Sequence, residues 1–174
     1  MRHIAITTII TMTTITLLSG CATMSPAPSA EATLIPTSGN KASGSVTFTQ
    51  QGESVMLTVK ISGLTPGAHG FHIHDKGDCS APDGTSAGGH FNPTAKPHGH
   101  PDRGDHHAGD MPALEADASG NASLSTQLRG VTLGEGANSI VGRGLIVHAA
   151  ADDYTTQPTG NSGARLACGV IVKR

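Results

Sequence analysis

Short stretches in which apolar and polar residues alternate dominate the chain from residue 45 onward. The clearest pair covers residues 45–50 and 54–61, and Gln51-Gly-Glu53 between them predicts a short hairpin turn. Further stretches of strand character follow at residues 69–74, 121–128, 139–148 and 166–172. No segment combines a helical period with helix-capping residues. The pattern therefore predicts an all-β protein, either a sandwich or a barrel.

The first twenty residues have a different pattern. Arg2 and His3 precede an apolar run over residues 4–18, which is short for a membrane span and ends in small residues. This arrangement is typical of an export signal. The sequence Leu18-Ser-Gly-Cys21 resembles the processing box of bacterial lipoproteins, which implies cleavage before Cys21 and a lipid on that cysteine. The alternative is an ordinary signal peptide that happens to contain a cysteine.

Between the signal and the alternating stretches lies a segment rich in proline, serine, alanine and threonine. Pro26, Pro28 and Pro36 fall within it and predict a flexible tether. We therefore expect a signal peptide over residues 1–20, a lipidated cysteine and tether over 21–42, and one domain over 43–174. The mature chain is long enough to bury a core of moderate size. Its expected location is the periplasmic side of a bacterial cell envelope, anchored through Cys21.

Charge and cysteine content narrow the class of protein. The net charge of −2 provides no basic face for nucleic acid, so no nucleic-acid partner is expected. If Cys21 carries a lipid, Cys79 and Cys168 remain, and an isolated pair in an exported protein suggests a disulfide. Such a bond would close a loop of about 90 residues and contribute roughly 4–5 kcal/mol in the chain-entropy model. The alternative is a pair of free buried thiols.

Histidines are concentrated in one part of the chain, between residues 67 and 110. Eight of the ten lie there: His69, His72, His74, His90, His98, His100, His106 and His107. Glycine and proline interrupt this part throughout and predict mostly loop. Long loops in compact domains are usually functional or disordered, and clustered imidazoles with a carboxylate favour a metal site.

The spacing of these residues indicates how they could converge on a metal. His72 and His74 lie on one face of a predicted strand, about 7 Å apart by strand rise, and Phe71 and Ile73 face the core. His107 and Asp110 are three residues apart around a glycine, so both can face one ion. A set made only of imidazoles suits copper, and a set with one carboxylate suits zinc. We expect this chemistry where two long loops meet, residues 75–116 and 149–164.

Five motifs together resemble the copper–zinc superoxide dismutases, in the order in which that family has them. They are Gly70-Phe-His-Ile-His74, Ser86-Ala-Gly-Gly-His-Phe-Asn-Pro93, His107-Ala-Gly-Asp110, Gly142-Arg-Gly-Leu-Ile-Val-His148 and Gly160-Asn-Ser-Gly-Ala-Arg-Leu-Ala-Cys-Gly169. The similarity covers about residues 43–174. It implies a Greek-key, immunoglobulin-like β-sandwich or flattened barrel with two long functional loops. It also implies the disproportionation of superoxide to hydrogen peroxide and dioxygen.

The resemblance also assigns residues to roles. The copper ligands would be His72, His74, His90 and His148, and the zinc ligands would be His90, His98, His107 and Asp110. His90 would bridge the two metals and take part in catalysis together with Arg165, which would hold the anion. Asp152 would link a copper histidine to a zinc histidine, and Cys79 would pair with Cys168. Of the remaining histidines, we expect His69 to support the framework and His100 to be solvated. His106 could replace His107 as a ligand, but the spacing of His107-Ala-Gly-Asp110 favours His107.

Two departures from the eukaryotic pattern are informative. Cys79 follows His74 by only five residues, which resembles the exported bacterial branch of the family. The loop over residues 149–164 is short and lacks lysine, so steering of the anion would rest on Arg165, with Lys76 or Lys96 as further candidates. A different class remains open, namely a lipid-anchored protein that binds or buffers copper and zinc without turnover. Both a monomer and a homodimer are compatible with the sequence.

Overall fold

The alternating stretches form an antiparallel hairpin at the centre of the sheet. In the computed structural model, which describes residues 26–174, β2 (Ser43–Gln51) pairs with β3 (Ser54–Ser62) from Ser43↔Ser62 to Gln51↔Ser54. Alternate residues, Val46 and Phe48 among them, are buried, and their neighbours face solvent. The predicted hairpin is therefore confirmed, with its turn at the predicted place.

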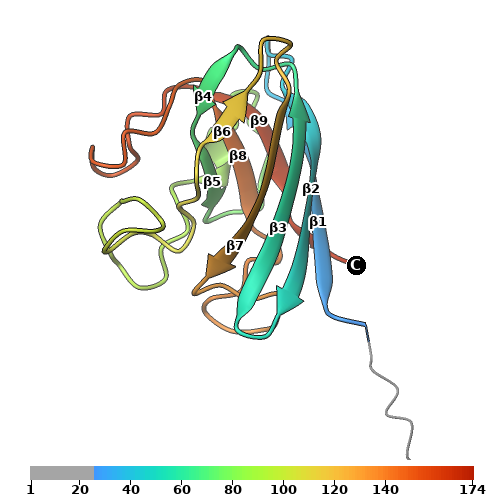
Figure 1. Ribbon diagram of the computed structural model, residues 1–174, viewed down its shortest axis with the longest axis vertical. Helices are drawn as coiled ribbons and strands as arrows, with labels where there is room; N and C mark the ends of the chain where they lie inside the picture. Colours follow the sequence, from blue (N-terminus) through green and yellow to red (C-terminus); the bar gives the residue numbers. More distant parts are fainter. Residues whose placement is uncertain (1–25) are drawn as a thin grey trace, which may run out of the picture.

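Ten strands in residues 26–174 form one antiparallel sheet (Figure 1). Besides β2 and β3 they are β1 (Ser29–Pro36), β4 (Gly67–His69), β5 (Phe71–His74), β6 (Leu114–Ala116), β7 (Ala122–Arg129), β8 (Gly144–His148), β9 (Arg165–Val170) and β10 (Val172–Lys173). Their order is β4-β6-β7-β3-β2-β1-β9-β8-β5, with β10 beside β1. The helical content of the described chain is a single 3₁₀ turn, Thr85–Ala87.

The order of the strands makes the sheet curl into a nearly closed barrel. Its two end strands, β4 and β5, are separated in the chain by Gly70 alone, so the two edges of the sheet must lie close together. The connections from β3 to β4 and from β7 to β8 skip neighbouring strands, as in Greek-key rather than up-and-down barrels. The predicted all-β, flattened-barrel class is confirmed.

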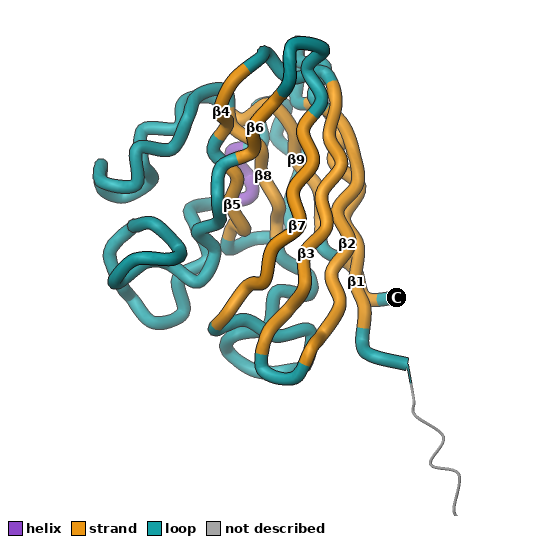
Figure 2. Tube along the Cα trace, in the orientation of Figure 1, coloured by secondary structure: helices purple, strands orange, loops and turns teal. Residues whose placement is uncertain are grey.

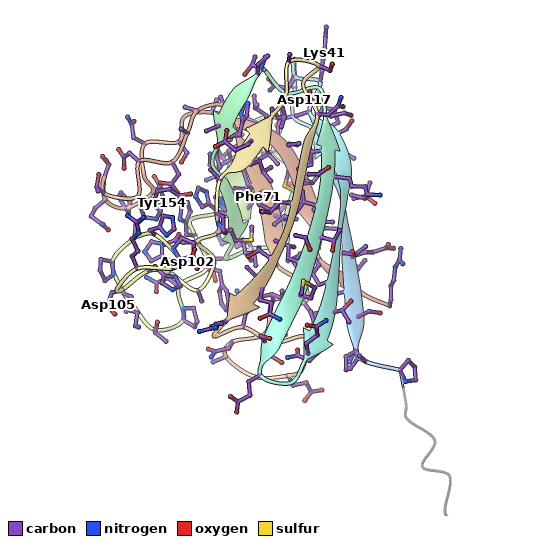
Figure 3. The ribbon with its side chains drawn as sticks, viewed as in Figure 1. Lys41, Phe71, Asp102, Asp105, Asp117 and Tyr154 are labelled. Atoms are coloured by element: carbon purple, nitrogen blue, oxygen red, sulfur yellow. A yellow bond between two sulfur atoms is a disulfide. The ribbon has the colours of Figure 1, made fainter. Side chains whose placement is uncertain are left out.

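Apolar side chains from both walls fill the barrel. Phe48, Phe71, Leu57 and Leu145 are fully buried and belong to one continuous core. Figure 3 shows Phe71 inside the barrel, whereas Tyr154 and Asp105 lie in the loop region beyond it. The core therefore supports β5 from one side and leaves its other side to the loops.

The tether prediction for residues 21–42 is wrong for residues 29–36, which form β1. This strand pairs with β2, β9 and β10. Ala30, Ala32 and Leu34 alternate into the core. Two of these three are alanines, so the alternation is weakly hydrophobic and the prolines on either side of it dominate the composition. The predicted signal peptide and Cys21 lie outside the described residues.

Other strand boundaries also differ from the prediction. The stretch 69–74 divides at Gly70 into β4 and β5. The strand predicted for 139–148 begins only at Gly144, because Ser139 forms an isolated bridge with Thr132 and a turn at residues 141–142 follows. The predicted strands at 121–128 and 166–172 are present as β7 and as β9 with β10. The short β6 was not predicted, because three residues are too few to show an alternation.

Two long loops lie on the side of β5 that faces away from the core (Figure 2). One follows β5 and leads to β6, and the other joins β8 to β9. A disulfide between Cys79 and Cys168 fastens the first loop to β9, as the sequence suggested. No helix within residues 26–174 is long and apolar enough to cross a membrane.

Candidate metal centre

Strand β5 and the loop that follows it bring the histidines together. One edge of β5 pairs with β8, and its other edge accepts the loop through the bridges His72↔Asp110 and His74↔His90. The backbone N–H of Ile73 donates to the Gly109 carbonyl over 2.9 Å. A Cβ at Gly109 would lie 2.2 Å from the carbonyl oxygen of Ile73, so this approach requires glycine. The loop is thereby attached to β5 at both bridges.

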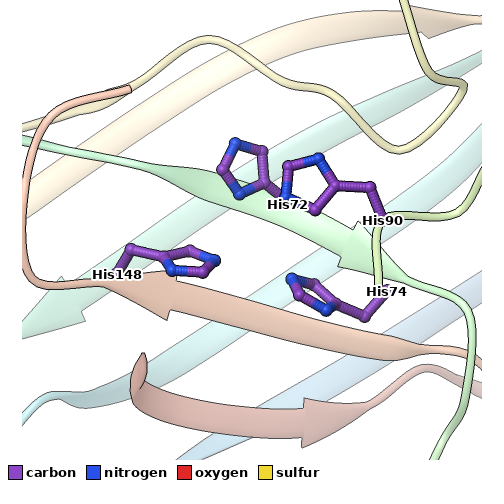
Figure 4. Close-up of side chains that lie close together, drawn as sticks. All are labelled: His72, His74, His90 and His148. Atoms are coloured by element: carbon purple, nitrogen blue, oxygen red, sulfur yellow. The ribbon is translucent and has the colours of Figure 1, made fainter. Parts of the chain in front are cut away.

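The first group of potential ligands consists of His72, His74, His90 and His148 (Figure 4). All four are buried, and one ligand atom from each lies within 4.8 Å of the others. His148 ends β8 at a point where the register with β9 shifts. Such an irregularity redirects a side chain at the end of a strand. The side chains of β5 and the end of β8 thus meet the ring of His90 from the loop.

The second group consists of His90, His98, His107 and Asp110, which are also buried. The Asp110 Oδ1 atom lies 2.8 Å from Nδ1 of His90, 3.0 Å from Nδ1 of His98 and 3.4 Å from Nδ1 of His107. Its Oδ2 atom accepts backbone N–H bonds from His107 and Gly99, at 2.8 and 3.1 Å. The carboxylate therefore orders the loop with one oxygen and presents the other to three rings.

Five ring nitrogens in the two groups are buried without a hydrogen-bond partner. They are Nδ1 of His72 and of His98, and Nε2 of His74, His90 and His148. Unpaired buried nitrogens are costly, and five in one place call for a ligand. The opposite nitrogens are occupied: Nδ1–H of His74 donates to the Gly88 carbonyl at 2.8 Å, and Nδ1 of His148 faces the Gly163 carbonyl at 3.3 Å. Each ring is thus held with a free lone pair directed inward.

Burial keeps these rings neutral. Desolvation lowers the pKa of His74 to about 2 and that of His148 to about 4, and it holds the pKa of His72 well below its usual value. Burial raises the pKa of Asp110, but hydrogen bonds from His90 and the His107 backbone outweigh it and lower that pKa to about 2. Neutral imidazoles and an ionised carboxylate are the forms that bind metal ions.

Asp152 connects the two groups through the ring nitrogens opposite the unpaired ones. Its Oδ2 atom accepts from Nε2–H of His72 at 2.6 Å, and its Oδ1 atom accepts from Nε2–H of His98 at 2.9 Å. The backbone N–H of Tyr154 also donates to Oδ1. A Cβ at Gly160 would lie 1.8 Å from that oxygen, so only glycine leaves room for the carboxylate. Asp152, which was singled out from the sequence, thus contacts one ring of each group.

Arg165 lies beside the first group. Its Nη1 and Nη2 atoms donate to the carbonyls of Gly84 and Gly88, both at 2.7 Å. The Gly88 carbonyl also accepts from His74, so one backbone group holds both side chains. The positive charge of Arg165 contributes to the lowered pKa of His74 and of His148, after burial, which is the main cause. The cation is therefore close enough to act on the first group.

Three further histidines of residues 26–174 lie outside both groups. His69 is buried, with Nδ1 2.7 Å from the His148 carbonyl and Nε2 2.8 Å from the Thr65 carbonyl, which fits the expected framework role. His100 packs against Tyr154, with ring centroids 4.5 Å apart. His106 faces the His107 carbonyl through Nδ1, so the geometry favours His107 over His106 in the second group.

Residues 42–171 match the family described as copper/zinc superoxide dismutase. The chain belongs to this family. It is 42% identical to the extracellular superoxide dismutase [Cu-Zn] of Caenorhabditis elegans over 148 residues, which cover 82% of this chain and 65% of that protein. It is also 42% identical to the superoxide dismutase-like protein YojM of Bacillus subtilis over 125 residues, or 69% of this chain and 64% of that one. The chain thus spans slightly less than two thirds of each relative.

Membership of the copper–zinc superoxide dismutase family agrees with the donors that the structure presents. Copper and zinc are the metals that two buried groups of imidazoles, one with a carboxylate, accommodate. The inward lone pairs give each group the atoms that a metal would bind. Copper and zinc are therefore the cofactors of this protein.

Sequence reasoning missed Gln157, which joins the two long loops. Its Oε1 atom accepts from the backbone N–H of His98 at 2.8 Å, and its Nε2 atom donates to the carbonyl of the same residue at 2.9 Å. This pair of bonds resembles one rung of a β-ladder. A glutamine in an irregular loop carries no periodic signal, so only its place in the fold reveals the contact.

Proposed function

We propose that this chain converts two superoxide anions and two protons into dioxygen and hydrogen peroxide. The observation that supports this most strongly is the pair of buried groups that share His90 beside the cationic Arg165. A protein that only stored metal would not need a fixed cation there. Family membership supports the same activity.

The proposal places copper in the first group and zinc in the second. Copper would be held by His72, His74, His90 and His148, and zinc by His90, His98, His107 and Asp110. The all-imidazole set suits copper, and the carboxylate in the second set suits zinc. His90 would serve both metals, because Nδ1 faces Asp110 while Nε2 is the unpaired atom.

Copper, when bound, supplies the one-electron redox chemistry, and zinc, with its full d shell, supplies charge and order without redox chemistry. The chain's own residues provide proton and anion handling. The Nε2 atom of His90 is the position where the chain would hold a proton destined for the peroxide. The Asp152 carboxylate would keep the rings of His72 and His98 in fixed orientation and tautomer.

Arg165 would bind the substrate anion. Its guanidinium is half-buried and held at two carbonyls, so little conformational freedom is lost when an anion arrives. Burial lowers the pKa of Arg165 from a high starting value, and the group stays charged at neutral pH. Lys96 is paired with Asp105 at 3.1 Å, which favours Arg165 as the main attractive charge.

The test is superoxide removal by the purified chain with its disulfide oxidised. Protein loaded with copper and zinc is compared with protein loaded with zinc alone. We expect fast removal only with copper, because only that form has redox chemistry. If both forms are inert while copper still binds tightly at one site per chain, the alternative of a metal-binding or buffering protein replaces the proposed enzyme.

The proposed location is the bacterial cell envelope, on the periplasmic side, with a lipid on Cys21. The support is the apolar run followed by Leu18-Ser-Gly-Cys21. Cys21→Ser removes the lipid acceptor, so the protein should leave the membrane fraction while its activity stays unchanged. Fractionation followed by an activity assay measures both. A variant that still sediments with membranes would show that the lipoprotein interpretation is wrong.

A further inference from the structure

A hollow of about 420 Å³ has Arg165 in its wall. Thr37, Thr85 and Gly163 contribute to its walls, and Gly163 also offers its carbonyl to His148. Two charged residues line it: Arg165 and Asp83. Arg165 of the proposed anion site and one acidic residue, Asp83, therefore line the same hollow.

Asp83 is adjacent in sequence to the residue that holds the guanidinium. Gly84, whose carbonyl accepts from Nη1 of Arg165, is so close that a Cβ there would lie 3.5 Å from both Cβ and Cδ of the arginine. The negative charge of Asp83 raises the pKa of Arg165, against the larger lowering effect of burial. The field of the carboxylate therefore reaches the guanidinium.

The Asp83 carboxylate is ionised and has no partner of opposite charge within ion-pair distance among residues 26–174. Its Oδ1 atom accepts from the backbone N–H and the hydroxyl of Thr85, at 3.0 and 2.7 Å. These bonds lower the pKa of Asp83 below its usual value. An exposed, permanently negative group therefore stands at the hollow without an ion pair to neutralise it.

We propose that Asp83 limits the rate at which anions reach Arg165 and the first metal group. An anion approaching through the hollow meets the repulsion of Asp83 as well as the attraction of Arg165, and like charges near a binding site reduce the rate of association. The inference rests on the proposed function for its biological meaning, and it extends that function by naming a charge that opposes substrate entry.

Asp83→Asn tests the charge without removing the turn. The asparagine side-chain oxygen can still accept both bonds from Thr85, so the loop should keep its conformation. We expect the second-order rate constant for superoxide removal to rise about twofold at low ionic strength, as for one unit charge several ångströms away in water. The gain should vanish in roughly 1 M salt, where screening acts within about 3 Å.

Asp78→Asn is the matched control. Asp78 lies in the same loop, is exposed, and accepts the backbone N–H of Ser80 at 2.9 Å, but it does not line the hollow. The Asp78→Asn variant loses the same unit of negative charge as Asp83→Asn, but its second-order rate constant for superoxide removal should stay unchanged. An equal gain in both variants would mean that only net charge matters, and would overturn the proposal.

Azide affinity of the copper-loaded protein, read from the copper absorption spectrum, separates this inference from the proposed function. Azide is a monovalent anion, and Asp83→Asn should tighten its binding by about the same twofold factor. If no form removes superoxide but azide binds more tightly to Asp83→Asn, the proposed function fails and the inference stands. If neither the rate nor the azide affinity rises in that variant, Asp83 does not limit anion access.

Discussion

The two ligand groups share His90 but depend on different kinds of structure. In the first, His72 and His74 project from β5 and His148 ends β8, so backbone pairing between two strands sets their positions. In the second, His98, His107 and Asp110 all come from the loop between β5 and β6. Hydrogen bonds between side chains and the backbone order that loop. The Asp110 carboxylate accepts from the backbone N–H groups of Gly99 and His107, and the Gln157 side-chain oxygen accepts from that of His98.

This difference indicates that the first group is built mainly on the strands of the barrel, whereas the second is built on an ordered loop attached to the barrel. Three of the four residues of the first group should stay in place whenever the barrel folds, because His72, His74 and His148 belong to strands that pack on the core. The second should depend on a few polar contacts and on its metal. Asp152 accepts a hydrogen bond from His72 of the first group and one from His98 of the second, so a change at one group can affect the other.

The largest effect should come from His148→Ala. His148 belongs only to the first group, so superoxide removal should fall to background while zinc binding and the disulfide remain largely intact. Activity and metal content are measured on the same preparation. His100→Ala, which removes a histidine outside both groups, is the control and should stay active. Full activity in His148→Ala would show that the proposed copper site is wrong.

Asp152→Ala should weaken both groups at once. It leaves Nε2 of His72 and of His98 without an acceptor, and loss of such partners typically lowers metal affinity by about 10- to 100-fold. Competitive chelator titrations with copper and with zinc measure the two affinities separately. A decrease for one metal only would mean that Asp152 does not couple the groups.

Gln157→Ala should affect the second group alone. It removes both bonds to the His98 backbone, and we expect zinc affinity to fall by about tenfold, the lower end of the range for outer contacts. Gln127→Ala removes an exposed glutamine on β7 and is the matched control. Copper affinity should stay at the parental value in both variants. An unchanged zinc affinity in Gln157→Ala would contradict the account of how the loop is held.

The smallest effect concerns pH and the metal-free protein. Burial lowers the folded-state pKa values of His72, His74 and His148 below the unfolded value of 6.5, so the unfolded chain binds protons first as the pH falls. Stability should therefore decrease from about pH 6.5 towards pH 4. Asp110, with a folded pKa of about 2, loses its contribution only at lower pH.

Thermal unfolding of the metal-free protein at neutral and at mildly acidic pH checks this sign. The unfolding temperature should be lower in acid, and the decrease should be smaller in His148→Ala, which lacks one of the depressed groups. An unfolding temperature that does not depend on pH, or rises in acid, would contradict the neutral, buried state of these rings.

The same difference between strands and loops explains which parts of the structure could be predicted from the sequence. Alternation found the hairpin and β5, and it placed His72 and His74 on one face. It missed β1, because alanines give a weak pattern among prolines. In the loops, motif spacing brought out His107 and Asp110, but no pattern in the sequence marks Gln157 as the partner of His98 or the Gly88 carbonyl as the acceptor for His74 and Arg165. Such contacts depend on three-dimensional positions that spacing does not encode.

Anomalous scattering from crystals of the copper- and zinc-loaded protein, recorded at the absorption edge of each metal, tests the assignment of the two groups most directly. We predict one copper peak among His72, His74, His90 and His148, and one zinc peak among His90, His98, His107 and Asp110, with the ring of His90 between them. Copper in the second group, or a single peak for both metals, would contradict the proposed centre.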